Sequence, residues 1–253
     1  MGAPGWGRVA AADAAAVDAG LRSYMLRVYN WMASGLLLTG IVAMAIVSVP
    51  SINGLFYEAV RSASGRLVMA PTMLWWVAAL SPLAFILVFS FGANRMSKTT
   101  AQALFWAFAA AMGASMSSLA YRYTGQSIAT TFFITAGMYA AMSLYGYTTK
   151  ADLTRWGSLL LMGLIGIILA SIVNIFIGSS ALAFAISVIG VVVFLGLTAF
   201  DTQRIKGDYI EYAYAEGTEI AGKRSVFDAL TLYLNFINLF QMLLSLLGQR
   251  QSE

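Results

Sequence analysis

The chain of 253 residues contains no cysteine and no histidine. The lack of cysteine excludes disulfide bonds, thiolate nucleophiles and thiolate metal sites. The lack of histidine removes the commonest general base, the commonest metal ligand and the side chain that usually changes charge near neutral pH. Any response to pH near neutrality must therefore come mainly from carboxylates whose surroundings make them share or hold a proton.

Charge is also scarce. Only 10% of the residues are charged and 60% are hydrophobic, with a mean hydropathy of +0.77. Soluble domains carry about 25% charged residues. The composition predicts an all-α polytopic membrane protein with a single domain. The net charge of +4 does not indicate a nucleic-acid partner, because basic residues flank membrane spans for reasons of topology.

Seven segments are apolar over about the 20 residues that a membrane helix needs. We expect an N-terminal cytoplasmic tail over residues 1–27, with a short interfacial helix at 17–27, and a short C-terminal tail over 249–253. Between them, over 28–248, lies the transmembrane domain. We expect an amphipathic excursion at 50–72 and a very tight turn at 178–181. The predicted spans are residues 28–49, 73–92, 103–120, 127–148, 157–177, 182–200 and 226–248.

The distribution of basic residues predicts the orientation. With the N-terminus in the cytoplasm, the segments on that side hold 11 of the 15 Lys and Arg residues. The positive-inside rule therefore favours a cytoplasmic N-terminus and a C-terminus on the outer side. This orientation places Asp201 and Asp228 together on the cytoplasmic side, at the two ends of the loop that joins the last two spans.

These two aspartates are the most informative residues of the chain. Asp201 ends the apolar run 188–200, and Asp228 lies in the first turn of the last span. A carboxylate at the edge of a hydrocarbon layer is costly and is by default a candidate functional group. The simpler interpretation of Asp228 is an acid near the N-terminus of a helix, where it stabilises the helix dipole. Both interpretations stay open.

The last span is unusually polar along one face. At the helical period, five polar side chains fall within an arc of about 100°. Polar groups at membrane depth face protein or a water-filled cavity, so we predict that the last helix is central, with the other six packed around it. Thr231 and Asn238 are candidates to line a pore, although hydrogen bonding between helices would explain them equally well. The five polar residues are Asp228, Thr231, Asn235, Asn238 and Ser245.

Two motifs give the chain a resemblance. LTAFDTQRIK at 197–206, a charged loop, and LTLYLNFINLF at 230–240 together resemble the Bax-inhibitor family of membrane proteins. The similarity covers the whole membrane portion. It implies a seven-helix bundle around a central last helix and, by analogy with characterised members, a pH-sensitive calcium leak channel; eukaryotic members suppress cell death. It also implies a bacterial inner membrane as the location.

The family pattern has a pair of aspartates that joins the last two helices and gates the pore. Asp201 matches the first, but Asn235 stands where the second aspartate should be. A family arginine near the end of the second helix corresponds to Arg95, and Arg204 is an alternative partner for Asp201. We therefore expect a latch at Asp201 with weakened pH control, since Asn235 cannot repel a carboxylate as an aspartate would.

Calcium is the cation that the resemblance suggests. It prefers six to eight oxygen ligands, and Asp201 and Asp228 are too few for tight binding, so we expect only weak, transient binding, as conduction requires. We expect no other cofactor. The expected partners are the lipid bilayer and calcium or other cations.

Other functions compete with this one. An enzyme is disfavoured: an intramembrane aspartyl protease needs a Gly-x-Gly-Asp sequence that Asp228 lacks, and serine chemistry of the rhomboid type needs a histidine. The main alternative is a non-conducting regulator that binds a membrane protease or another membrane protein. A proton-coupled transporter is a third possibility.

Overall fold

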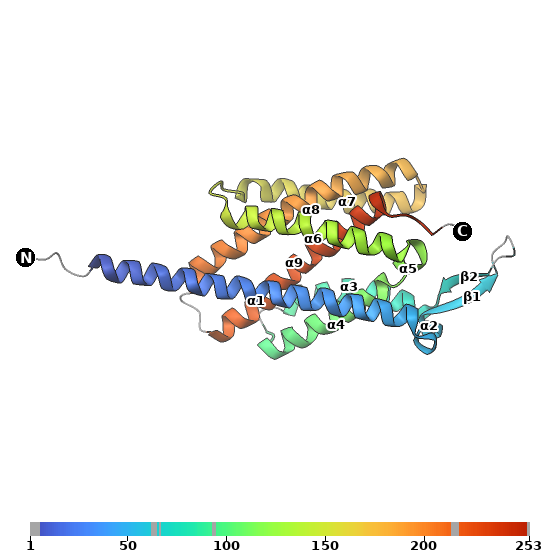
Figure 1. Ribbon diagram of the computed structural model, residues 1–253, viewed down its shortest axis with the longest axis horizontal. Helices are drawn as coiled ribbons and strands as arrows, with labels where there is room; N and C mark the ends of the chain where they lie inside the picture. The colour runs from blue at the N-terminus through green and yellow to red at the C-terminus, as the bar shows by residue number, and fades with distance from the viewer. Residues whose placement is uncertain (1–5, 62–64, 66, 93–94, 214–217, 252–253) are drawn as a thin grey trace, which may run out of the picture.

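The computed structural model describes residues 6–61, 65, 67–92, 95–213 and 218–251, and these are almost entirely helical (Figure 1). Seven helical stretches among them are long and apolar enough to cross a membrane, which confirms the expected all-α polytopic architecture. In chain order the elements are α1 (Trp6–Ser48), α2 (Pro50–Phe56), β1 (Tyr57–Arg61), β2 (Leu67–Pro71), α3 (Met73–Gly92), α4 (Lys98–Met116), α5 (Leu119–Arg122), α6 (Gly125–Thr148), α7 (Thr154–Ile177), α8 (Ser180–Asp208), the π-helical η1 (Tyr209–Ala213) and α9 (Thr218–Leu247).

The connections follow from local sequence signals. The Ser97 and Thr124 side chains cap α4 and α6 by accepting hydrogen bonds from backbone N–H groups in the first turn. The predicted tight turn after the fifth span is confirmed. Gly178 ends α7 in the left-handed conformation, with φ at +68°, and its N–H donates to the Asn174 carbonyl at 2.8 Å. Ser179 then caps α8.

The N-terminal segment differs from the expectation. Residues 17–27 are not a separate interfacial helix but part of α1, which runs unbroken from Trp6 to Ser48. The reason lies in composition: the segment is rich in alanine, and after Pro4 no proline occurs until Pro50, so nothing ends the helix. Residues 1–5 of the expected tail lie outside the described residues.

The link between the first two spans also differs. In place of an amphipathic excursion, the chain forms the short helix α2 and an antiparallel hairpin of β1 and β2, in which Tyr57 pairs with Pro71 and Arg61 with Leu67. The pairing satisfies the backbone of this polar link without a long helix. The buried Tyr57 hydroxyl also forms a 2.7 Å hydrogen bond with Ser117, which fixes the hairpin to the end of α4.

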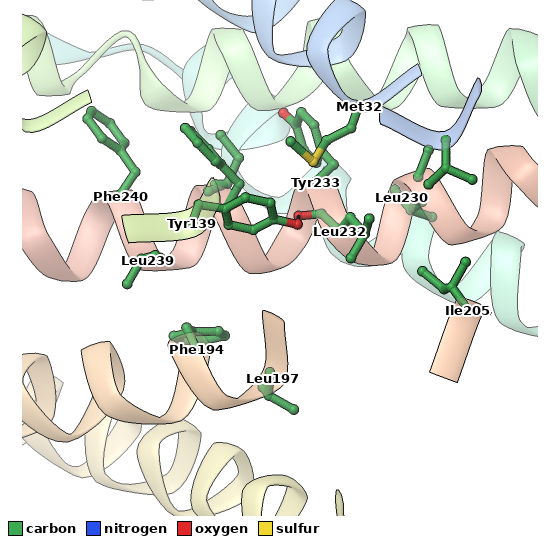
Figure 2. Close-up of a cluster of buried hydrophobic side chains, with 14 of the residues drawn as sticks. Met32, Tyr139, Phe194, Leu197, Ile205, Leu230, Leu232, Tyr233, Leu239 and Phe240 are labelled. Atoms are coloured by element: carbon green, nitrogen blue, oxygen red, sulfur yellow. Dashed lines mark hydrogen bonds between the residues drawn. The ribbon is translucent and has the colours of Figure 1, made fainter. Parts of the chain in front are cut away.

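Helix α9 is central, as predicted, and is the most buried of the seven spans. It packs directly on α1, α4, α6 and α8, whereas α3 packs mainly on α4 and α7 mainly on α8, so these two helices form an outer layer (Figure 1). The hydrophobic core surrounds α9 (Figure 2). There, Tyr139 of α6 donates a 3.1 Å hydrogen bond to the Leu232 carbonyl of α9. Two residues of the polar face of α9, Asn235 and Ser245, form hydrogen bonds with α8, whereas Asp228 bonds to α1.

Candidate functional site

Asp201 is buried at the interface of α8 and α9, with 6% of its surface exposed. The Asn235 amide of α9 donates a 2.8 Å hydrogen bond to its Oδ2 atom. The Arg204 guanidinium, one turn further along α8, lies 2.9 Å from its Oδ1 atom. Both carboxylate oxygens are therefore occupied, one by each helix. We call Asp201, Asn235 and Arg204 the latch.

The local sequence explains why these groups meet. The spacing of three residues places Asp201 and Arg204 on the same face of α8. Arg204 keeps 42% of its side chain exposed, as expected for a long cation at the end of an apolar run. Asn235 is 6% exposed and belongs to the polar face of α9 that the sequence identified. The latch thus joins α9 to α8 through a hydrogen bond from a neutral amide to a carboxylate that an ion pair holds within α8.

Asp228 has a different partner. The Tyr24 hydroxyl of α1 donates a hydrogen bond of 2.5 Å to its Oδ2 atom. Tyr24 is only 5% exposed, so this contact ties the N-terminal half of α1 to α9. Because α9 begins at Thr218, Asp228 lies well beyond its first turn, and the helix-dipole interpretation of Asp228 does not apply. The positive charge of Arg204 also acts on Asp228. Asp228 therefore belongs to the same end of the bundle as the latch without touching Asp201 through any described hydrogen bond.

The sequence reasoning missed Tyr24. The available signal was the buried stripe of α1, where apolar or aromatic side chains recur at helical spacing. Such a stripe predicts burial but cannot predict which polar group a tyrosine hydroxyl will reach on another helix. The stripe consists of Leu21, Tyr24, Met25 and Val28.

A second set of hydroxyl groups was also missed. The Tyr29 hydroxyl of α1 forms a hydrogen bond with the Ser143 hydroxyl of α6. Ser143 in turn forms a 3.1 Å hydrogen bond with the hydroxyl of Thr202, the residue after Asp201. These contacts link α1, α6 and α8 directly beside the latch.

The remaining candidate residues lie outside the latch. Arg95 is exposed after the end of α3, and in the part of the chain that the structure describes, the ion pair of Asp201 is made with Arg204. Thr231 and Asn238 bond to carbonyl oxygens of their own helix, at 3.3 and 2.9 Å. Their role in lining a pore stays a prediction.

A cation would find this site closed. Both Asp201 oxygens are occupied, and Asp228 accepts the Tyr24 hydroxyl. Among the described residues, no three acidic side chains cluster in a way that could hold a metal ion. A calcium ion would have to displace Arg204 or Asn235 to reach the Asp201 carboxylate. The geometry therefore does not suit tight cation binding in this conformation.

Comparison with known proteins agrees with the geometry. The model of the family described as inhibitor of apoptosis-promoting Bax1 matches residues 21–252. The chain belongs to the Bax-inhibitor family. The match includes both segments that carry the latch, so the contact between α8 and α9 lies within the family region.

Bacterial members of the Bax-inhibitor family are similar over nearly the whole chain. An uncharacterised protein of Rickettsia prowazekii is 49% identical over 234 residues, which is 92% of each chain. An uncharacterised protein of Caulobacter vibrioides is 48% identical over 96% of each chain. The inner membrane protein YbhL of Escherichia coli K12 is 44% identical over 92% of this chain and 94% of its own.

Proposed function

We propose that this Bax-inhibitor family protein is a cation leak channel that passes calcium and is held closed by the latch between α8 and α9. One observation carries the proposal: a charged carboxylate is buried between two helices of an apolar bundle, and its partners come from both. Burying a carboxylate is costly unless it is paired and hydrogen-bonded. A bundle that needed only stability could use an apolar contact here.

The neighbouring contacts support a closed state at this end of the molecule. The bond from Tyr24 to Asp228 holds α1 against α9, and the hydroxyl groups of Tyr29, Ser143 and Thr202 join three helices. An opening that separates α8 from α9 would expose Asp201 and Asp228 together. Two carboxylates attract a divalent cation, and calcium favours such oxygen ligands.

We also propose a bacterial inner membrane as the location, with the N-terminus cytoplasmic. The relative YbhL is named an inner membrane protein, and the basic residues support the orientation. Because the chain has no cysteine, single-cysteine variants can report the membrane orientation of each loop. We expect an impermeant maleimide to label Glu58→Cys in the hairpin from the outer side, and Ala151→Cys, between α6 and α7, only after lysis. The reverse pattern would overturn the orientation.

The function is tested by calcium flux into liposomes that contain only the purified protein, from pH 5 to pH 8. Asp201→Asn removes the charge that both partners hold. The hydrogen bond from Asn235 then becomes weaker, so the closed state loses stability and the flux should rise. Asp152→Asn is the matched control. Asp152 is exposed between α6 and α7. Hydrogen bonds from Thr154 lower its pKa, so it stays ionised across this range.

Two results would contradict the channel. Equal flux in Asp201→Asn, Asp152→Asn and the unchanged protein would mean that the latch does not gate the pathway. No flux in any of them, with the protein folded and inserted, would favour the alternative, a non-conducting regulator that needs a membrane-protein partner. The proposal includes no catalytic step.

A further inference from the structure

A long apolar groove separates α1 from α6. Its volume is about 1030 Å³, which is at the upper end of the range of about 300–1,000 Å³ for small-molecule sites. Its lining runs along α1 from Arg22 to Met44. At 1.5 Å per residue this is about 33 Å, close to the 30 Å thickness of a bilayer core. The groove therefore follows the hydrocarbon layer across most of its depth.

Small side chains keep the groove open. Ala33 and Gly40 of α1 and Ala140 of α6 face it and are exposed. A Cβ atom built on Gly40 would meet no atom within 4 Å. The floor is formed by aromatic rings of α6 and α9, including Tyr139 and Phe236. The space is thus an open groove that fits a flexible apolar chain, and not a loosely packed part of the core.

A second hollow of about 630 Å³ adjoins the groove at its N-terminal end and contains polar side chains among its lining residues. The two hollows share Arg22 and Leu26, and the second adds Arg27 and Asn30. Arg22 and Arg27 are both exposed, and neither forms an ion pair within the described residues. Arginine binds phosphate through a planar fork of donors. We call this second space the arginine hollow.

Two tryptophans mark the level of this hollow in the membrane. The rings of Trp31 and Trp106 lie beside it, with centroids 5.7 Å apart. Tryptophan is enriched at the boundary between the hydrocarbon and the headgroups. The arginine hollow therefore lies where lipid phosphates lie, and the groove continues from it into the hydrocarbon layer.

We propose that the groove and the arginine hollow form one binding site for an anionic phospholipid. The headgroup phosphate pairs with Arg22 and Arg27, and an acyl chain lies in the groove against Phe236. The order of the features matches the ligand: two cations at the headgroup level, then a continuous apolar path. Because Ser143 lines the groove and forms a hydrogen bond with Thr202, the residue after Asp201, the acyl chain passes close to the latch.

The site is tested by native mass spectrometry of the purified, delipidated full chain, titrated with phosphatidylglycerol and with phosphatidylcholine. Each basic side chain near a membrane surface raises the affinity for anionic lipid about fivefold. Arg22→Gln or Arg27→Gln should therefore each weaken phosphatidylglycerol binding about fivefold, and both together about 25-fold. Phosphatidylcholine carries the same phosphate but its choline cation offsets the charge, so its binding should start weaker and fall less in these variants. Gly40→Leu fills the groove, and we expect it to abolish binding of both lipids.

Each variant has a matched control. Arg155→Gln removes one positive charge at the exposed start of α7, and Gly137→Leu adds the same side chain on α6 where a Cβ meets nothing and the residue does not line the groove. Both should bind lipid as the unchanged protein does. Ala33→Leu serves in place of Gly40→Leu if that variant does not fold.

The proposal predicts that glycerol phosphate, which carries the headgroup chemistry without an acyl chain, will not compete. Unchanged phosphatidylglycerol binding in the double arginine variant would overturn the headgroup assignment. Unchanged binding in both Gly40→Leu and Ala33→Leu would overturn the groove. Both measurements are of binding alone and stay valid even if the protein conducts no ion.

Discussion

Removing the Asn235 amide should open the proposed channel. Asn235→Ala deletes the donor that lies 2.8 Å from Asp201 Oδ2. A hydrogen bond to a charged group contributes about 1.5–3 kcal/mol. The remaining partner, Arg204, is 42% exposed, and ion pairs of exposed side chains contribute only about 0–1 kcal/mol. The loss of the Asn235 bond is therefore the larger effect.

If this bond forms only in the closed state, its loss moves the equilibrium by its whole value. At about 1.4 kcal/mol per factor of ten, the open population should rise about 10- to 150-fold. The assay is the initial rate of calcium entry into liposomes at matched protein density. Arg204→Gln should change the rate much less, because the ion pair of Arg204 with Asp201 lies within α8 and does not have to break when α8 and α9 separate.

The control is Asn238→Ala, which makes the same substitution three residues later on α9. The Asn238 amide donates to the Leu234 carbonyl of its own helix, so its removal breaks no contact between helices. Because the latch stays intact, we expect the closed state to persist and the calcium rate to stay far below that of Asn235→Ala, whether or not Asn238 lines the open pore. If Asn235→Ala and Asn238→Ala leak equally, or if neither leaks more than the unchanged protein, the latch does not hold the channel closed.

Two further predictions concern stability and are measured as the melting temperature in detergent micelles. Tyr24→Phe removes the hydroxyl that donates to Asp228 and should destabilise the protein by about 1.5–3 kcal/mol, whereas the same change at the half-exposed Tyr145 should have little effect. Gly146→Ala places a methyl group against the backbone of α8, closer than van der Waals contact allows. Overpacking costs about 1–3 kcal/mol, more than the gain in helix propensity. At Gly137 an added methyl group would meet no atom within 4 Å, so Gly137→Ala should keep the gain in helix propensity. Destabilisation by both glycine variants would refute the packing argument.

Much of the fold was predictable because hydropathy and helical period are local properties. The seven spans follow from apolar runs long enough to cross a bilayer, and the central position of α9 follows from its polar face. The pairing of Asp201 with Asn235 was expected from the resemblance to the Bax-inhibitor family, in whose pattern two aspartates at these positions join the last two helices.

The missed features depend on tertiary geometry. Tyr24 is more than 200 residues from Asp228 in the chain, and no local pattern relates them. The choice of Arg204 over Arg95 depends on where α3 lies, and α3 turned out to pack mainly on α4 in the outer layer. The hairpin of β1 and β2 was missed because two five-residue strands carry a weak signal beside long apolar helices.

Because Asn235 is neutral, the latch carries one negative and one positive charge. Adding a second negative charge at position 235 tests whether this balance keeps α8 and α9 together. In the unchanged protein, Asp201 and Arg204 offset each other, and the neutral Asn235 adds no charge between α8 and α9. In Asn235→Asp, two carboxylates face each other across that interface, and Arg204 can offset only one of them. At low pH the two acids share a proton and stay together, whereas at high pH both are charged and repel. The calcium leak of Asn235→Asp should therefore rise from pH 5 to pH 8 more steeply than that of the unchanged protein. Parallel pH profiles would show that α8 and α9 are not held by charge at this position.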